Sequence, residues 1–533
     1  MWRRRLLWPV VPALVATLVL PARFASAKLV EPLQEQQNYA IGLERSRAWD
    51  TPDLQAQVAA ATAQYQRERA AALVADPGRQ PNPNSCSTVA ACPIDPRLDN
   101  WTAHGGIVTP VLFTARDGAT LSGHVWATRS GPAKRPGVLF INGSIIGYEQ
   151  GYWYIAEALA RSGFVVMTFD TQGEGMSDQF GQAPDRLEGA FAGTPVLGLA
   201  SPQHTLGGSG LPFYDGGEDA LNFFLSSPAH PYLPVPSRGT GTSHAAKQSA
   251  RVQAGLDPAY DPLWRILDRD EIGVSGHSYG AQAASWLVQE DPRLKAAVAL
   301  DSLCAPAWPS LDELTSLAEA PVNRIAGVAP GGAPYGFARD CFGVPQGPAP
   351  GITKPALGIS GDYLLDYSPY LTDPDPNAKN LASDAYTQAG ADSGQIAIRG
   401  GTHLDFGDAP LPFLPASLRG IDLATWYTTA WFDKYLKHDP AADAILTTSR
   451  WRNDVVTGEV DPAHESNLYS YHYVSRLDIT LANGRRFDCE NLRDGCPGQT
   501  SPATDCGPAN YSFLATDTGT EPADTCAGAR GQP

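Results

Sequence analysis

Short apolar runs alternate with helix-forming segments through the middle of the chain. GVLFING (Gly137–Gly143) and FVVMTFD (Phe164–Asp170) are almost entirely apolar, as are strands that are buried on both faces of a sheet. A helix-forming segment, GYWYIAEALARSG, lies between these two runs, and another surrounds Glu218–Leu225. Further apolar runs are IGVSG, KAAVALD, PALGIS and QIAIRG. The alternation predicts an α/β fold with a mostly parallel, doubly wound sheet that is covered on both faces.

Other elements flank this region. GIVTPVLFTARDGATLSGHVWATR predicts two strands joined by a turn at Asp117-Gly118. Capping signals at 50–53 predict a helix that runs toward Val74. The segment Asp422–Lys437 predicts a helix that closes the main domain. Beyond it, Tyr469, Tyr471 and Tyr473 alternate as in a strand, and Asn483-Gly484 marks a hairpin turn.

These patterns divide the chain into four parts. They are a leader at 1–27, a helical extension at 28–100, an α/β domain at 101–440, and a β and disulfide tail at 441–533. Long insertions rich in Gly, Pro or Ser interrupt the domain near 178–211, 226–261 and 304–353. Insertions of this length act as lids or caps, or decorate the surface. The apolar lid candidates are Phe191, Val196, Leu197 and Leu199.

The first 27 residues have the design of a secretory signal peptide. Three arginines at 3–5 precede an apolar run from Leu6 to Leu20, and Ala25-Ser26-Ala27 offers a cleavage site. The run is too short for a dependable membrane span, and no later segment approaches 18 uninterrupted apolar residues. We therefore expect a protein that is secreted, to the outside of the cell or to the periplasm or cell wall, without a stable membrane span.

The net charge and the cysteines of the chain limit which ligands and which cross-links we expect. Removal of residues 1–27 takes away four arginines and changes the formal net charge from −17 to −21. A surface with this charge repels nucleic acid, so we expect no nucleic-acid partner. Eight cysteines in an exported chain predict disulfides, and nearest-neighbour pairing gives 86–92, 304–341, 489–496 and 506–526. No cysteine spacing typical of a zinc site is present, so we expect no metal and no cofactor.

The stretch IGVSGHSYGAQAASWL contains a G-x-S-x-G motif between a predicted strand and a predicted helix. Gly276 and Gly280 flank Ser278 at the spacing that a tight strand-to-helix turn requires. Such a turn exposes the serine hydroxyl at the carboxyl edge of the sheet, where ligands bind in open α/β folds. Ser278 is therefore the predicted nucleophile, and we expect His277 to point away from it and to pack.

A serine nucleophile needs a base and an acid that orients it. His403 follows the last predicted strand of the domain in IRGGTHLDF, and the glycines before it allow a loop to reach the strand ends. Asp301 and Asp362 both end predicted strands at the same edge, with Asp366 as a more distant candidate.

The core resembles the α/β-hydrolase superfamily, and three segments are similar to the plasma-type platelet-activating-factor acetylhydrolases, which are calcium-independent lipases. They are GHSYGAQAASWL with AVALDSL, then PALGISGDYLLDYSPY, and IAIRGGTHLDF, within roughly 137–406. The resemblance to the superfamily implies an α/β-hydrolase fold, and the habit of that superfamily favours Asp362, which follows the later strand. The resemblance to the acetylhydrolases instead implies Asp301 as the acid, with Asp362 as the alternative. Family members usually have His-Gly where this chain has Asn142-Gly143.

An attacked ester carbonyl requires amide donors for the negative charge on its oxygen. We expect them from Tyr279 and from Ser144, with Gly143 as the alternative to Ser144. The sequence thus predicts a serine carboxylester hydrolase, of the esterase or lipase class, for a small-molecule or lipid-like ester. The alternatives are a serine peptidase or amidase of the same fold and a non-catalytic binding protein. The oligomeric state stays open.

Overall fold

The computed structural model describes most of the α/β region and its flanks. The described residues are 52–79, 92, 101–103, 105–144, 147–186, 210–307, 339–341, 343–345, 347–363, 374–408, 418–449 and 469–500. The predicted signal peptide and part of two predicted insertions lie outside them. So do the lid candidates Phe191, Val196, Leu197 and Leu199, and the cysteines Cys86, Cys506 and Cys526.

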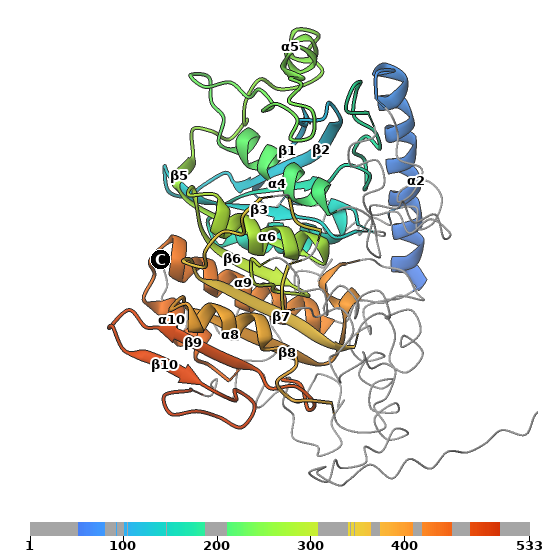
Figure 1. Ribbon diagram of the computed structural model, residues 1–533. Helices are drawn as coiled ribbons and strands as arrows, with labels where there is room; N and C mark the ends of the chain where they lie inside the picture. The colour runs from blue at the N-terminus through green and yellow to red at the C-terminus, as the bar shows by residue number, and fades with distance from the viewer. Residues whose placement is uncertain are drawn as a thin grey trace, which may run out of the picture.

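A single ten-stranded sheet forms the centre of the fold (Figure 1), in the order β1-β2-β4-β3-β5-β6-β7-β8-β9-β10. The strands from β4 to β8 in this order run parallel to their neighbours, and antiparallel pairs close both edges. The strands are β1 (Gly106–Thr114), β2 (Thr120–Thr128), β3 (Arg135–Ile141), β4 (Val165–Asp170), β5 (Leu267–His277), β6 (Leu294–Leu300), β7 (Ala356–Tyr363), β8 (Ser393–Thr402), β9 (Arg476–Thr480) and β10 (Arg486–Cys489).

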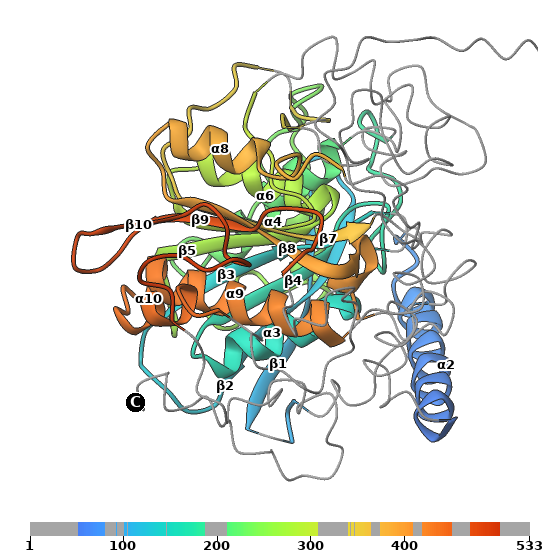
Figure 2. The ribbon, with the colours of Figure 1, turned by 90° about the horizontal axis from the view of Figure 1, so that it is seen from below.

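Helices cover both faces of this sheet, as the apolar character of its central strands predicts. Figure 2 shows α3 and α9 on one side and α4, α6 and α8 on the other. The helices are α2 (Pro52–Ala75), α3 (Trp153–Arg161), α4 (Leu211–Phe224), α5 (Ala245–Gln253), α6 (Tyr279–Glu290), α8 (Leu381–Gln388), α9 (Leu418–Leu436) and α10 (Ala441–Leu446). None of these helices has the length and apolar character needed to cross a membrane.

The hydrophobic core is split by the sheet into two layers. One layer packs α3 and α9 against the sheet, and its largest buried side chains include Trp126, Trp431 and Tyr427. The other packs α4 and α6 against the opposite face and includes Trp286 and Phe113. The predicted α/β class with a mostly parallel sheet is therefore confirmed.

The N-terminal helix α2 lies along one side of the domain and is tied to it by polar contacts (Figure 1). Asp76 receives two hydrogen bonds from Arg251 in α5, at 3.1 and 2.7 Å. Arg251 also binds the buried Asp257 at 2.8 Å. The hydroxyl of Tyr65 accepts a hydrogen bond of 2.6 Å from Gln150. The insertion at 226–261, which contains α5, therefore anchors the helical extension.

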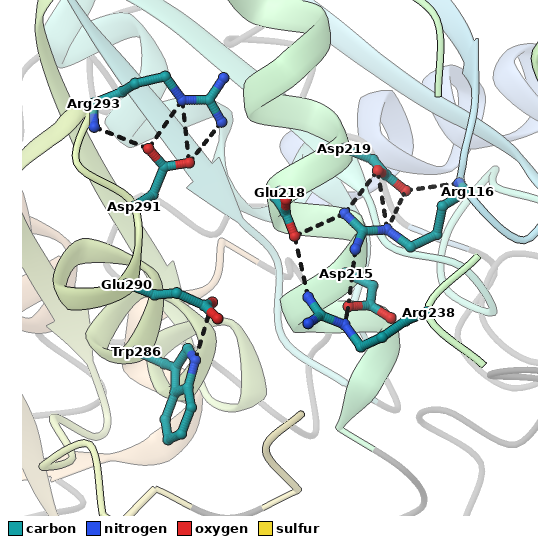
Figure 3. Close-up of polar contacts among 9 residues, drawn as sticks. All are labelled: Arg116, Asp215, Glu218, Asp219, Arg238, Trp286, Glu290, Asp291 and Arg293. Carbon is teal, nitrogen blue, oxygen red and sulfur yellow. Dashed lines mark hydrogen bonds and ion pairs between the residues drawn. The ribbon is translucent and has the colours of Figure 1, made fainter. Parts of the chain in front are cut away.

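Helix α4 carries a cluster of carboxylates that binds two arginines from other parts of the chain (Figure 3). Arg116, directly after β1, binds Asp219 and Glu218, each at 2.9 Å. Arg238, from the insertion at 226–261, binds Asp215 at 2.9 Å. Burial raises the pKa of Asp219 to about 6 in spite of the attraction of Arg116. This network joins the first hairpin and the insertion to α4.

The described cysteines pair as nearest neighbours. Disulfides join Cys304 to Cys341 and Cys489 to Cys496, as predicted. Cys92 is also disulfide-bonded, and its predicted partner lies outside the described residues. The described part of the chain thus contains no free cysteine.

The tail adds a β-hairpin to the edge of the sheet. Strands β9 and β10 pair around the predicted Asn483-Gly484 turn, where Gly484 has a φ of 80°. The predicted strand over the three alternating tyrosines is wrong, because only Tyr469 forms a bridge, to Ile398. The Oγ atom of Ser470 accepts the amides of His472 and Tyr473 at 3.0 and 2.8 Å, and these bonds bend the chain away from the sheet.

Arg116→Met is expected to lower the free energy of unfolding by about 3–5 kcal/mol, because it leaves the buried Asp219 carboxylate without its cation. Arg116 is 4% exposed and Asp219 is fully buried. Arg293→Met is the matched control, since the Arg293 side chain is 38% exposed and its partner is the adjacent Asp291. Its loss should stay below about 1 kcal/mol. Urea denaturation measures the free energy of unfolding of both variants. Equally small losses of stability would contradict the stabilising role assigned to Arg116.

Candidate functional site

Ser278 lies between β5 and α6 in a strained backbone conformation. Its φ is 58° and its ψ is −122°, a region that residues with a side chain rarely occupy. Such a conformation costs on the order of 1–3 kcal/mol and persists only where the surrounding structure holds it. The amide of Ser278 donates to the carbonyl of Leu300 in β6 at 3.0 Å. The strand-to-helix turn predicted for this serine is therefore present.

The two glycines of the motif allow this turn to form. A Cβ atom at Gly276 would lie 2.3 Å from the carbonyl oxygen of Gly280. A Cβ atom at Gly280 would lie 2.2 Å from the carbonyl oxygen of Ile141, at the end of β3. Neither position can hold a larger residue unless the backbone moves, so the spacing of the motif reflects close contact between the start of α6 and two strands.

His403 and Asp301 are brought together at the carboxyl edge of the sheet. His403 follows β8 and begins a 3-10 helix, and Asp301 follows β6. The His403 Nδ1 atom lies 2.6 Å from Asp301 Oδ2. Because a carboxylate only accepts, Nδ1 carries the hydrogen, and Nε2 is left as the acceptor in the neutral ring. The carboxylate therefore orients the imidazole as a general base requires.

Asp301 is held in place by the neighbouring strand. Its amide donates to the carbonyl of Ile359 in β7 at 2.8 Å, and its φ of 41° is left-handed. Its side chain is 1% exposed. Among the described residues, none donates a hydrogen bond to Asp301 Oδ1. One oxygen of this buried carboxylate thus binds His403, and the other has no hydrogen-bond donor.

Asp362, the other candidate acid, has different partners. Its Oδ2 accepts the amide of Gly400 at 2.7 Å, and its Oδ1 accepts the hydroxyl of Ser470. These bonds join the ends of β7 and β8 to the segment at 469–475. Of the two alternatives, the structure places Asp301 beside His403. The third candidate, Asp366, lies outside the described residues.

His277 links three parts of the candidate site. Its Nε2 donates to the backbone carbonyl of His403 at 2.9 Å, so its Nδ1 is the acceptor for the hydroxyl of Tyr152 at 2.7 Å. The Tyr152 oxygen in turn accepts the amide of Gly143 at 3.2 Å. Burial and the neighbouring His403 lower the pKa of His277 well below its usual value, so the ring is neutral.

The sequence predicts only part of this chain of hydrogen bonds. His277 is buried, as the packing interpretation predicts, and its polar atoms also connect the serine turn to the loop of His403. The rings of His277 and His403 have centroids 4.4 Å apart. Tyr152 was missed, because nothing distinguishes it from the other aromatic residues of its helix-forming segment.

The loop after β3 packs against the serine turn. A Cβ atom at Gly143 would lie 3.2 Å from the Cβ atom of Ser278. The amide of Gly143 is already bonded to Tyr152, whereas the half-buried Ser144 follows it in the same loop. Tyr279 is the first residue of α6, and its ring stacks on Phe213 with centroids 5.2 Å apart. The hydrogen bond to Tyr152 counts against the Gly143 amide as a donor to substrate, and Ser144 stays the prediction for this loop.

This edge of the sheet thus presents a serine hydroxyl, an imidazole and a carboxylate. Within the described ranges, no group of three or more His, Cys, Asp or Glu side chains is arranged to bind a metal ion. The loop after β4 is structural, since Asp170 accepts the amides of Glu149 and Met176, each at 2.7 Å.

Gly280→Ala is expected to destabilise the protein by about 1–3 kcal/mol, because the new methyl group would overlap the Ile141 carbonyl. Helix propensity alone would make the same change stabilising by about 1 kcal/mol. The control is Gly351→Ala, where a Cβ atom meets nothing within 4 Å. Thermal unfolding should show a loss for Gly280→Ala and almost none for Gly351→Ala. A gain at position 280 would contradict the packing described.

Comparison with known proteins gives no assignment. No family model matches the chain, and no curated protein is significantly similar to it. The candidate site is therefore defined by its own geometry: a strained serine turn, and a histidine and carboxylate paired at the same edge of the sheet.

Proposed function

We propose that this protein is a serine hydrolase of the α/β-hydrolase fold that cleaves carboxylic esters. The observation that carries the proposal is the hydrogen bond of 2.6 Å between His403 and Asp301, at the sheet edge that also presents the left-handed Ser278. A left-handed serine between a strand and a helix, in a G-x-S-x-G motif, is typical of the nucleophile in this fold.

The order of the residues along the chain supports the proposal. Ser278 follows β5, Asp301 follows β6 and His403 follows β8. Nucleophile, acid and base occur in this order in α/β-hydrolases, unlike the orders of other serine hydrolases. All three lie at the carboxyl ends of parallel strands, where the loops of such sheets bind substrates.

In the proposed reaction, the Ser278 oxygen attacks the ester carbonyl carbon while His403 Nε2 takes the hydroxyl proton. Asp301 accepts the hydrogen bond from Nδ1 and stabilises the imidazolium that forms. The amides of Tyr279 and Ser144 donate to the negatively charged oxygen of the tetrahedral intermediate. The intermediate collapses, the carbon–oxygen bond to the alcohol breaks, and His403 returns its proton to the leaving oxygen.

Water completes the cycle on the acyl-enzyme. His403 removes a proton from the water as its oxygen attacks the acyl carbon, and the second tetrahedral intermediate releases the carboxylic acid and restores the Ser278 hydroxyl. The chain itself supplies every group that this cycle uses. We infer that the substrate is a small-molecule or lipid-like ester and that the protein is secreted, an inference supported by the disulfides and by the signal-peptide pattern.

Ser278 should react covalently with a fluorophosphonate probe, and Ser278→Ala should abolish both the labelling and esterase activity. Purified protein is incubated with the probe, and labelling is measured by fluorescence after electrophoresis. Parallel assays compare p-nitrophenyl esters with aminoacyl anilides. Faster cleavage of anilides would favour a peptidase, and an unlabelled wild-type protein would favour a non-catalytic binding function.

Asp301→Asn should lower kcat by roughly 10⁴-fold, because the amide cannot accept the Nδ1 hydrogen and favours the wrong imidazole tautomer. Asp362→Asn is the matched control, since its oxygen can still accept the Gly400 amide and its nitrogen can donate to Ser470. For this variant we expect kcat at pH 8 to fall by less than about tenfold. Steady-state kinetics on a p-nitrophenyl ester measures both. The reverse ranking would make Asp362 the acid.

A further inference from the structure

A lysine is buried behind the candidate acid. Lys379, just before α8, is 4% exposed, and its Nζ atom donates to the carbonyl of Gly361 near the end of β7. The Nζ atom also lies 4.4 Å from the centroid of the Tyr473 ring. Burial lowers the pKa of Lys379 to about 8, and the charges of Asp301 and Asp362 oppose this change. The amine is therefore largely protonated at neutral pH.

The register of the sheet brings this amine close to Asp301. Leu300 pairs with Ile359, and the amide of Asp301 donates to the Ile359 carbonyl. Gly361, which holds the lysine, is only two residues further along β7. Asp301 Oδ1 is buried and has no hydrogen-bond donor among the described residues. A buried carboxylate oxygen without a hydrogen-bond donor is stabilised by a nearby positive charge.

We propose that Lys379 is a positioning residue for the Asp301–His403 pair, and that its ammonium supplies the positive charge that the buried Asp301 carboxylate lacks. The proposal rests on the proposed function. Lys379 acts through Asp301, since the hydrogen bond to Gly361 and the contact with Tyr473 hold it behind the acid and not beside a substrate.

The charged and titratable groups around the pair define the expected effect. Asp301, Asp362 and the Tyr473 ring face Lys379. Asp301 and the neutral His277 face His403. A cation near Asp301 opposes a second positive charge at the neighbouring imidazole, so we expect Lys379 to extend activity to lower pH. Asp362 acts in the opposite sense, because its negative charge favours the imidazolium.

The C-terminal segment completes this arrangement. Val474 donates its amide to Pro376 at 2.8 Å and accepts a hydrogen bond from Asn380, the neighbour of Lys379, at 3.1 Å. Ser470 in the same segment donates to Asp362. Residues beyond the α/β domain therefore help to hold Lys379 in position.

The test measures the pH dependence of kcat/KM for p-nitrophenyl butyrate, and of fluorophosphonate labelling, from pH 5 to 8. Lys379→Met should move the acid limb of both profiles to higher pH, because the cation near Asp301 is lost. Lys379→Arg keeps the charge and should leave the acid limb close to that of the wild type.

Charge compensation separates this role from a purely structural one. Asp362→Asn should move the acid limb to lower pH, and the double variant Lys379→Met/Asp362→Asn should return it toward the wild-type position. The inference would be overturned if Lys379→Met lowered the rate without moving the acid limb of the pH profile. It would also be overturned if Lys379→Met and Lys379→Arg moved the acid limb equally. If methionine at 379 prevents folding, Lys379→Gln takes its place, and an acid limb that does not move in that variant also overturns the inference. A wild-type protein that is neither labelled nor active would instead refute the proposed function.

Discussion

The close approach of three backbone segments at Ser278 is the constraint on which the rest of the site depends. The end of β3, the end of β5 and the first turn of α6 meet so tightly that Gly276 and Gly280 leave no room for a side chain. This contact holds Ser278 in its left-handed conformation. The hydrogen bond from the Ser278 amide to the Leu300 carbonyl adds β6 to the same cluster. The free energy that the strained turn costs is therefore offset by the core of the sheet, and the position of the hydroxyl follows from the packing of the domain.

The side chains of His277 and Tyr152 extend this rigidity to the surrounding loops. Their hydrogen bonds join the loop after β3, the serine turn and the loop of His403 in one neutral, buried chain. A neutral link suits this place, because a charge on His277 would oppose the imidazolium that the proposed reaction forms on His403. The loops around the candidate site are thus joined by two side chains, His277 and Tyr152, that do not titrate near neutral pH.

The sequence predicts the parts of this arrangement that local pattern determines. The serine turn, the alternation of strands and helices, the first hairpin and the Asn483-Gly484 turn each follow from spacing, turn residues or apolar runs. The choice between Asp301 and Asp362 does not, because both carboxylates end strands at one edge and their partners lie elsewhere in the chain. Asp362 is bound by Ser470, 108 residues later, and Lys379 matters only through the register of β6 and β7. Such contacts leave no pattern in the sequence around the residues that form them.

The docking of α2 has a consequence for the order in which the molecule is assembled. Asp76 binds Arg251, which lies 175 residues later, and Tyr65 binds Gln150, 85 residues later. At a synthesis rate of about 5–20 residues per second, Arg251 emerges roughly 10–35 s after Asp76. Helix α2 therefore exists for that time without the Arg251 anchor, and only its contact with Gln150 can form earlier.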